Sequence, residues 1–208
     1  ERTGTRQNKT MKIIGVTGGV GSGKSELLAY IKTKYNCRIL MADEAAHKVK
    51  EPGQPCYDKL VALLSEQVLS EDGQIDKAKM ARMIFEDETL RRKVNDLIHP
   101  AVKEYILSEL LAEKEKGEAD FFFLEAALLI ECGYLELVDQ MWYIYADKQV
   151  RRERLKRARG YSDEKIDAIM NSQLGEAEYR ANCHTVIDNS GSLQEAYDQI
   201  DRKLGEML

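Results

Sequence analysis

The sequence predicts an α/β fold, in which a parallel five-stranded sheet is flanked by helices. Three observations lead to this prediction. Five short apolar segments, rich in β-branched or aromatic residues, have the length of buried strands. Segments of helical composition separate them, and such alternation favours a parallel sheet. A glycine-rich turn joins the first strand to the first helix. The predicted strands are residues 12–17, 38–41, 120–124, 140–145 and 185–188.

The helices follow from apolar spacing and from capping residues. We expect helices at residues 25–35, 43–50, 148–159 and 193–207, and another that starts at Ser162 as its N-cap. Between residue 57 and about residue 115 the composition is helical throughout. We expect breaks there at residues 71–73 and at His99-Pro100, because the residue before a proline disfavours the helical conformation.

The long helical stretch is more than a strand-to-strand connection needs, so we interpret it as an insertion that covers a substrate. The predicted organisation is a disordered leader at residues 1–10, with Met11 as a candidate natural start, and a single domain at 11–208. Within that domain the core is 11–53 and 118–208, the insertion about 54–117, and a short lid about 148–175.

Composition narrows the class of protein. The chain has 208 residues, a net charge of −5 and 43% hydrophobic residues, which favours a globular protein and not a nucleic-acid binder. Its longest apolar run is far shorter than the roughly 20 residues of a membrane span. The four cysteines form no C-x-x-C pair, so we expect reduced thiols in a cytoplasmic protein with no structural zinc.

The glycine-rich turn has the spacing of a phosphate-binding P-loop, G-x-x-x-x-G-K-[ST]. Gly18, Gly23, Lys24 and Ser25 meet this pattern. Glycines let backbone N–H groups surround a phosphate, and the following helix directs its positive end toward the anion. Lys24 adds a charge near the outer phosphates and Ser25 a hydroxyl ligand for Mg²⁺. The predicted nucleotide contacts are Gly18, Gly19, Val20, Gly21, Ser22, Gly23, Lys24, Ser25 and Glu26.

A P-loop by itself indicates a nucleoside triphosphate, not a reaction. The N-K-x-D guanine reader of GTPases is absent from the sequence, and an acidic residue, Asp43, follows the second predicted strand. Together with the short chain, these features favour a small-molecule kinase. A nucleoside monophosphate kinase stays open as an alternative. So does a nucleotide-binding switch without acceptor chemistry, although it would have little need of the insertion.

Further motifs occur along the chain from about residue 12 to residue 205. They include IGVTGGVGSGKS at 14–25, Ala42-Asp43 with Ala46-His47, Ile98-His99-Pro100, Arg154-Leu155, Gln173, and VIDNSGS at 186–192. In this order they resemble the dephospho-coenzyme A kinase family. The resemblance implies a P-loop kinase fold with ATP and Mg²⁺. It also implies phosphorylation of the ribose 3′-hydroxyl of dephospho-CoA, the last step of coenzyme A synthesis. We expect a monomer or a weak homo-oligomer.

The resemblance also suggests roles for individual residues. Asp43 corresponds to the proposed catalytic base, although from the sequence alone it fits the N-cap of helix 44–50 equally well. His47 and His99 correspond to the acceptor-binding region; for His99 the alternative is a histidine at a helix break. Asn189 corresponds to a loop against the adenine, and the alternative is a simple turn.

Arginines crowd the predicted helix at 148–159, either as a solvated face or as a lid that places guanidinium groups on the transferred phosphoryl group. We assign catalytic roles to Lys24, Arg154 and Arg159 beside Asp43. Two departures from the family pattern stand out. Ala158 replaces the arginine that usually follows the Arg-Leu pair by three residues, and Met41 replaces the first Asp of an Asp-Ala-Asp motif. Ala158 leaves open which lid arginine acts, and Met41 removes a possible second carboxylate, which leaves Asp43 to act alone beside the metal.

Overall fold

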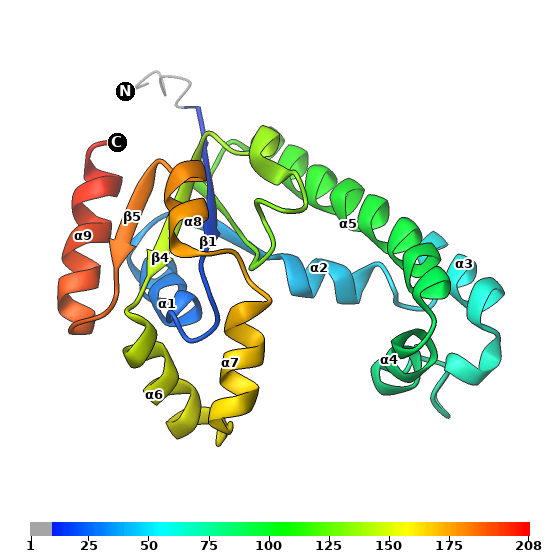
Figure 1. Ribbon diagram of the computed structural model, residues 1–208. Helices are drawn as coiled ribbons and strands as arrows, with labels where there is room; N and C mark the ends of the chain where they lie inside the picture. The colour runs from blue at the N-terminus through cyan, green and yellow to red at the C-terminus, as the bar shows by residue number, and fades with distance from the viewer. Residues whose placement is uncertain (1–9) are drawn as a thin grey trace, which may run out of the picture. The chain divides into compact units, whose positions relative to one another are not determined.

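The computed structural model describes residues 10–208. Residues 1–9 of the predicted leader lie outside the described residues. A sheet of five strands forms in the order β2-β3-β1-β4-β5, and Figure 1 labels β1, β4 and β5. Its strands are β1 (Lys12–Thr17), β2 (Cys37–Met41), β3 (Phe121–Glu125), β4 (Gln140–Tyr145) and β5 (Thr185–Asp188). Each lies within a few residues of its predicted position, and the five-stranded parallel α/β architecture is confirmed.

The centre of the sheet is β1, which pairs in parallel with β3 on one side and with β4 on the other. All five residues of β3 and the last five residues of β1 are buried. Strands buried in this way are typical of a parallel sheet that is covered on both faces. Trp142 and Phe121, Phe122 and Phe123 are among the largest fully buried side chains and form the middle of this core.

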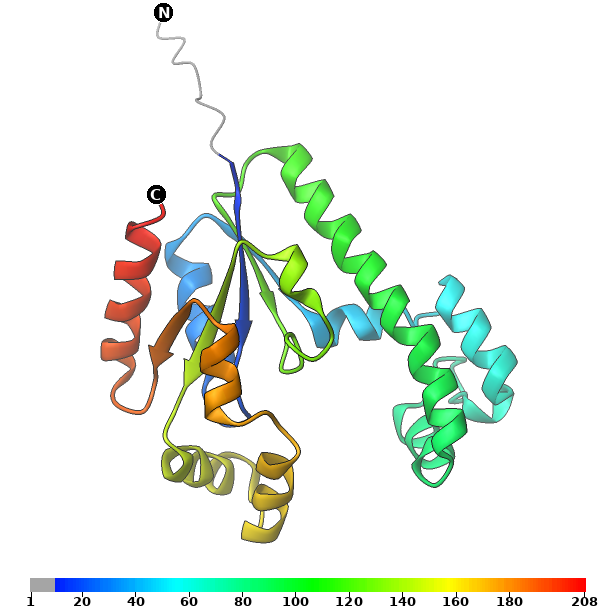
Figure 2. The same cartoon turned by 45° about the horizontal axis from the view of Figure 1, so that its top comes forward.

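Helices cover both faces of the sheet. Helix α1 (Lys24–Lys34) packs with α9 (Leu193–Gly205) on one face, and α8 (Glu176–Asn182) packs against β4 on the other (Figure 1). The right-handed rule for parallel crossovers accounts for the opposite faces of α1 and α8, because the chain moves in opposite directions across the sheet after β1 and after β4. Helices α6 (Lys148–Arg159) and α7 (Asp163–Asn171) lie beyond the carboxyl ends of β1 and β4, as Figure 2 shows.

Capping residues set the bounds of these helices. Asp147 caps α6 by accepting a hydrogen bond from the Gln149 backbone N–H, and Gly160 ends the helix in the left-handed conformation. Ser162 caps α7, as the sequence predicts, by accepting from the Lys165 backbone N–H.

A short 3₁₀ turn, η2 (Tyr134–Leu137), precedes β4. No helix among residues 10–208 is long and apolar enough to cross a membrane.

The chain divides into two compact units. The first comprises the chain up to Ile39 and from Lys116 onward, and the second comprises Leu40–Glu115. The second unit therefore begins near the end of β2, and the insertion predicted at about 54–117 stays a prediction. Its elements are α2 (Ala42–Lys48), α3 (Pro55–Leu64), the 3₁₀ turn η1 (Glu66–Val68) and α4 (Lys77–Phe85), followed by α5 (Glu88–Lys116), which ends at the unit boundary.

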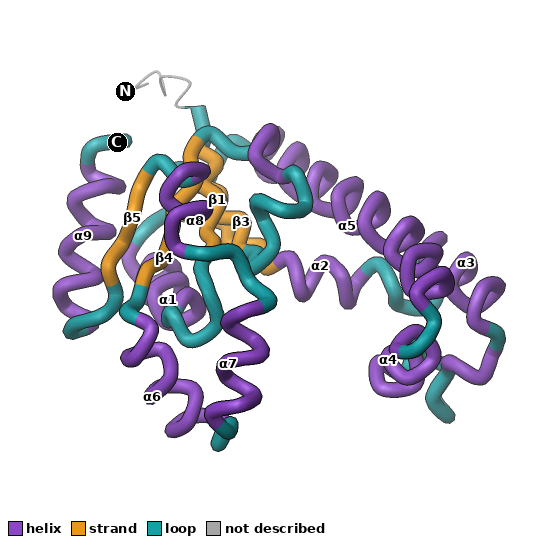
Figure 3. The backbone as a smooth tube through the Cα atoms, in the orientation of Figure 1, coloured by secondary structure: helices purple, strands orange, loops and turns teal. Residues whose placement is uncertain are grey.

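The expected helix break at His99-Pro100 is wrong. Helix α5 runs through both residues as one continuous helix of 29 residues (Figure 3). Proline removes one backbone donor and costs a helix interior about 3 kcal/mol. The buried row Val94, Val102, Ile106 and Leu110 extends to both sides of it and outweighs this local cost. His99 is therefore an exposed helical residue and not a loop histidine.

Candidate active site

The predicted phosphate loop lies between the end of β1 at Thr17 and the start of α1 at Lys24. Its glycine at position 23 is required by the backbone, which has φ 87° there. The neighbouring side chain also requires a glycine at this position, because a Cβ on Gly23 would collide with Asn189. The loop thus has the strand-before, helix-after setting that the sequence predicts, with the positive end of α1 directed at it.

Lys24 folds back over the start of this loop. Its Nζ donates hydrogen bonds to the carbonyl oxygens of Gly18, at 2.7 Å, and Gly19, at 3.4 Å. Ser25 follows directly, in the first turn of α1. The ammonium group is therefore held at the mouth of the loop, where an anion bound to the backbone N–H groups would meet it.

Arg154 and Asn189 brace the second half of the loop. Arg154 Nη1 lies 3.3 Å from the carbonyl oxygens of both Gly21 and Ser22, and its Nη2 donates to the Asn189 carbonyl at 2.6 Å. Asn189 Nδ2 donates to the Ser22 carbonyl at 2.9 Å, and the Asn189 residue is only 1% exposed. Both residues thus shape the loop. The adenine contact expected of Asn189 and the catalytic role expected of Arg154 stay predictions.

The first half of the loop is held by two residues that the sequence analysis did not assign to the site. Arg151 Nε donates to the Val20 carbonyl at 2.9 Å, and its guanidinium would collide with a Cβ at Gly19. Gln173 Oε1 accepts from the Val20 backbone N–H at 3.0 Å and from Arg151 Nη2 at 3.3 Å. The arginine-rich helix was the available signal, but helical periodicity cannot tell which arginine faces a loop more than 100 residues away.

Arg159, the other predicted lid residue, lies near the aromatic ring of Tyr161. Its guanidinium carbon is 5.8 Å from the ring centroid, and Lys165 Nζ lies 3.8 Å from it. The Arg159 hydrogen bond and the Lys165 charge lower the pKa of the Tyr161 hydroxyl. The described contacts of Arg159 are thus with the α6–α7 connection and not with the loop, and its catalytic role stays a prediction.

Asp43 and His47 belong to the second unit, where both are exposed on α2. The N-cap alternative for Asp43 is wrong. Met41 occupies the N-cap position, and Asp43 lies inside the first helical turn. A carboxylate in the first turn interacts favourably with the helix dipole and, being exposed, is free to meet a substrate. The roles of Asp43, His47 and His99 stay predictions.

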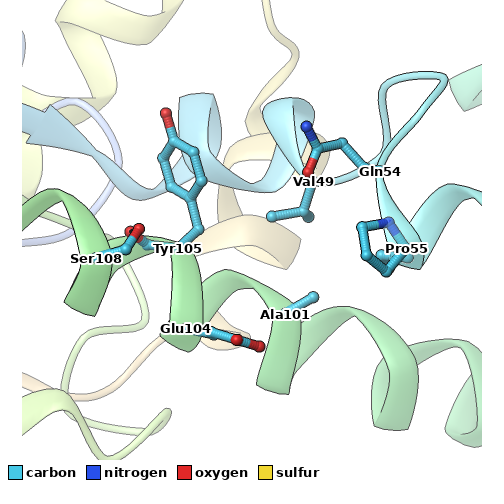
Figure 4. Close-up of a pocket in the computed structure, with 8 residues that line it drawn as sticks. Val49, Gln54, Pro55, Ala101, Glu104, Tyr105 and Ser108 are labelled. Carbon is cyan, nitrogen blue, oxygen red and sulfur yellow. The ribbon is translucent and has the colours of Figure 1, made fainter.

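The second unit also contains a pocket of about 260 Å³. Figure 4 shows Ala101, Glu104, Tyr105 and Ser108 of α5 on one side, and Val49, Gln54 and Pro55 on the other. The lining combines apolar side chains with hydroxyl, amide and carboxylate groups, which is typical of small-molecule sites.

Lys50, which the sequence analysis did not assign to the site, follows Val49 of the pocket lining in the chain. Burial lowers the pKa of Lys50, and the charge of Lys77 lowers it further, while Cys56 and Asp43 act in the opposite direction. A half-buried lysine within electrostatic reach of Asp43 is a candidate contact for an anionic substrate. One lysine among many in a charged segment gave no signal in the sequence.

The site has few side chains that could hold a metal ion. Among residues 10–208 no group of three or more His, Cys, Asp or Glu residues has the arrangement of a metal site. Glu125 is a buried carboxylate at the carboxyl end of β3, paired in register with Val16 of β1 just before the loop. One hydroxyl, Ser25, and one carboxylate fit Mg²⁺, which keeps most of its waters and takes phosphate oxygens as ligands.

Comparison with known proteins supplies the family. The family model described as dephospho-CoA kinase matches residues 12–195, which is most of the chain. The chain belongs to the dephospho-CoA kinase family. Dephospho-CoA kinases of Geobacillus kaustophilus and Aquifex aeolicus are each 34% identical to it. The alignments cover 90% of this chain and 92% of the Geobacillus protein, and 95% of this chain and 98% of the Aquifex protein.

Solved structures share the fold of this chain. A Thermus thermophilus protein superposes with a TM-score of 0.79 at 29% identity, covering 96% of this chain and 100% of its own. Dephospho-CoA kinase from Campylobacter jejuni gives 0.71 at 22% identity, with coverage of 94% and 96%. Shikimate kinase from Bacteroides thetaiotaomicron, with a TM-score of 0.54 at 13% identity over 95% of this chain and 98% of its own, shares the fold alone.

Proposed function

We propose that the protein transfers the terminal phosphoryl group of ATP to the ribose 3′-hydroxyl of dephospho-CoA, giving coenzyme A and ADP. The observation that carries this proposal is the phosphate loop from Gly18 to Ser25, which stands between β1 and α1 in a chain of the dephospho-CoA kinase family. The loop supports triphosphate binding, and the family supports the acceptor.

Catalysis would come mainly from positioning and charge stabilisation. The acceptor hydroxyl oxygen attacks the terminal phosphorus, the bond to the bridging oxygen of ADP breaks, and the hydroxyl proton passes to Asp43. Lys24 holds the outer phosphates, and Arg154 and Arg159 belong to the lid. Ser25 and Glu125 would hold Mg²⁺, which would neutralise part of the phosphate charge. Asn189 contributes to adenine binding through its loop.

The second unit is the proposed acceptor site. The pocket between Gln54-Pro55 and Tyr105 presents apolar, hydroxyl and amide groups, which suit an elongated polar molecule such as dephospho-CoA. Lys50 offers a positive charge for its phosphates, and His47 and His99 lie on helices of the same unit. A cytoplasmic location and a monomeric or weakly oligomeric state stay predictions.

The decisive experiment measures ADP release by the purified protein with and without dephospho-CoA, and then the mass of the product. We expect release that depends on the acceptor and a product heavier by one phosphoryl group. Equal release in both samples would overturn the proposal. A panel of nucleoside monophosphates and other alcohols tests for another small-molecule kinase. Nucleotide binding without turnover on any acceptor would indicate a switch.

A further inference from the structure

One amide oxygen in the first unit is surrounded by donors that suit an anion better than a neutral group. Oε1 of Gln173 accepts from the Val20 backbone N–H at 3.0 Å and from Arg151 Nη2 at 3.3 Å. Both neighbours can only donate, so the atom facing them is the oxygen of the amide. A phosphate oxygen at this point would accept the same two hydrogen bonds with the help of its charge, and such bonds are about twice as strong as neutral ones.

The position of this donor pair indicates which phosphate it would meet. The backbone N–H groups at the start of α1, around Gly23, Lys24 and Ser25, are suited to an inner phosphate. Val20 lies in the first half of the loop, next to Gly19, where the absence of a Cβ lets the Arg151 guanidinium approach. A nucleotide held at the helix end therefore extends its terminal phosphate toward Val20 and Arg151.

Three other arginines of the lid have partners elsewhere, and Arg157 is exposed. Arg154 donates to three backbone carbonyl groups, so both of its terminal nitrogens already have partners in the backbone. Arg152 is paired with Asp163 and Asp167 of α7. Arg159 lies near the ring of Tyr161. Arg151 also donates to a backbone carbonyl, that of Val20, through Nε, but its Nη2 donates to the side chain of Gln173, which can move away.

We propose that Arg151 and the Val20 backbone N–H bind the terminal phosphate of ATP, and that this phosphate displaces the side-chain oxygen of Gln173. Gln173 thus competes with the phosphate that distinguishes ATP from ADP, and its release couples donor binding to the segment that follows α7. The inference rests on the proposed function of the loop as an ATP site. Arg151 then makes the contact that distinguishes ATP from ADP, in a chain that has Ala158 at the usual position of a lid arginine.

The test compares ADP with the non-hydrolysable ATP analogue AMP-PNP by calorimetry, with Mg²⁺ present. In Arg151→Met we expect the ratio of AMP-PNP to ADP affinity to fall about tenfold, the effect of losing a charge-assisted bond to the extra phosphate. In Gln173→Met, which keeps the side-chain length but removes the acceptor, we expect the ratio to rise about threefold. Arg157→Met is the matched control on α6, since Arg157 is exposed, and its ratio should not change.

The ratio separates this inference from simple support of the loop. If Arg151→Met weakens ADP and AMP-PNP equally, Arg151 only braces the loop and the inference is wrong. An unchanged or lowered ratio in Gln173→Met also overturns it, and this variant leaves the arginine in place should Arg151→Met fail to fold. Failure of the proposed function looks different, because the wild-type protein would then bind neither nucleotide or would release ADP without regard to dephospho-CoA.

Discussion

Arg154 Nη2 donates a 2.6 Å hydrogen bond to the backbone carbonyl of Asn189, and the Asn189 side chain donates in turn to the Ser22 carbonyl at 2.9 Å. The loop after β5 is thereby joined to the phosphate loop after β1. Because the phosphate loop consists largely of glycines, it has little side-chain packing of its own to fix its conformation. Its shape depends on these bonds from outside.

Replacing Asn189 should therefore loosen the loop. We expect Asn189→Ala to lower the free energy of unfolding by about 1–2 kcal/mol, because the Ser22 carbonyl loses a buried donor. Loss of the unpaired buried Oδ1 of Asn189 offsets part of this cost. Urea denaturation measures the change. Asn182→Ala is the matched control, since Asn182 Nδ2 donates a similar 2.8 Å bond to the Glu178 carbonyl at an exposed site. Equal losses in the two variants would contradict the bracing role.

A methyl group at Gly23 should abolish the fit between the loop and Asn189. Gly23→Ala places a Cβ at φ 87° against Asn189 Nδ2, whereas Gly133→Ala has a similar φ of 73° with no atom within 4 Å. Both variants incur the left-handed backbone penalty of about 1–2 kcal/mol. Only Gly23→Ala should lower ATP affinity strongly, by about tenfold or more, as measured by calorimetry. Similar ATP affinity in the two variants would show that the Asn189 contact is dispensable.

The proposed base gives a kinetic prediction. Asp43→Asn keeps the size of the side chain but removes the proton acceptor, so we expect kcat to fall by at least about 100-fold with little change in ATP affinity. Glu44→Gln removes the neighbouring exposed carboxylate of the same helical turn and should leave kcat nearly unchanged. Near-normal turnover by Asp43→Asn would remove this residue from the mechanism.

A carboxylate far from the site should govern part of the acid stability. Burial alone would raise the pKa of Asp201, but hydrogen bonds from Lys34, Tyr35 and Tyr30 outweigh burial and lower it. Lys34 Nζ lies 2.6 Å from Oδ2, and the Tyr35 hydroxyl lies 2.6 Å from Oδ1. A lowered folded-state pKa means that this stabilisation is complete above the unfolded pKa of about 3.9 and is lost as the pH falls through the folded value.

We therefore expect Asp201→Asn to lower the free energy of unfolding by about 1 kcal/mol at pH 6, a modest value because Lys34 is half exposed. Urea denaturation at pH 6, pH 4 and pH 3 should show the difference from the wild type shrinking below about pH 4. A difference that stays constant down to pH 3, or grows there, would contradict this account.

The sequence predicted the elements that depend on local chemistry. The apolar runs that became β1, β4 and β5, the Ser162 cap of α7 and the end of α6 at Gly160 all lie where residue type and spacing indicate them. The phosphate loop belongs to the same class, because its glycines, Lys24 and Ser25 follow one another in the chain. Each of these features is set by residues within a few positions of one another, so its signal is complete in a short segment.

Tertiary structure decided what depends on distant residues. It carried α5 through Pro100, because a buried row on both sides outweighs a local rule. It also selected Arg154 and Arg151 from an arginine-rich helix to contact a loop more than 130 residues earlier, and enclosed Asn189 behind that loop. Local periodicity fixes the face of a helix on which a side chain lies, but the partner that this face meets is set by how the strands are ordered and the helices packed.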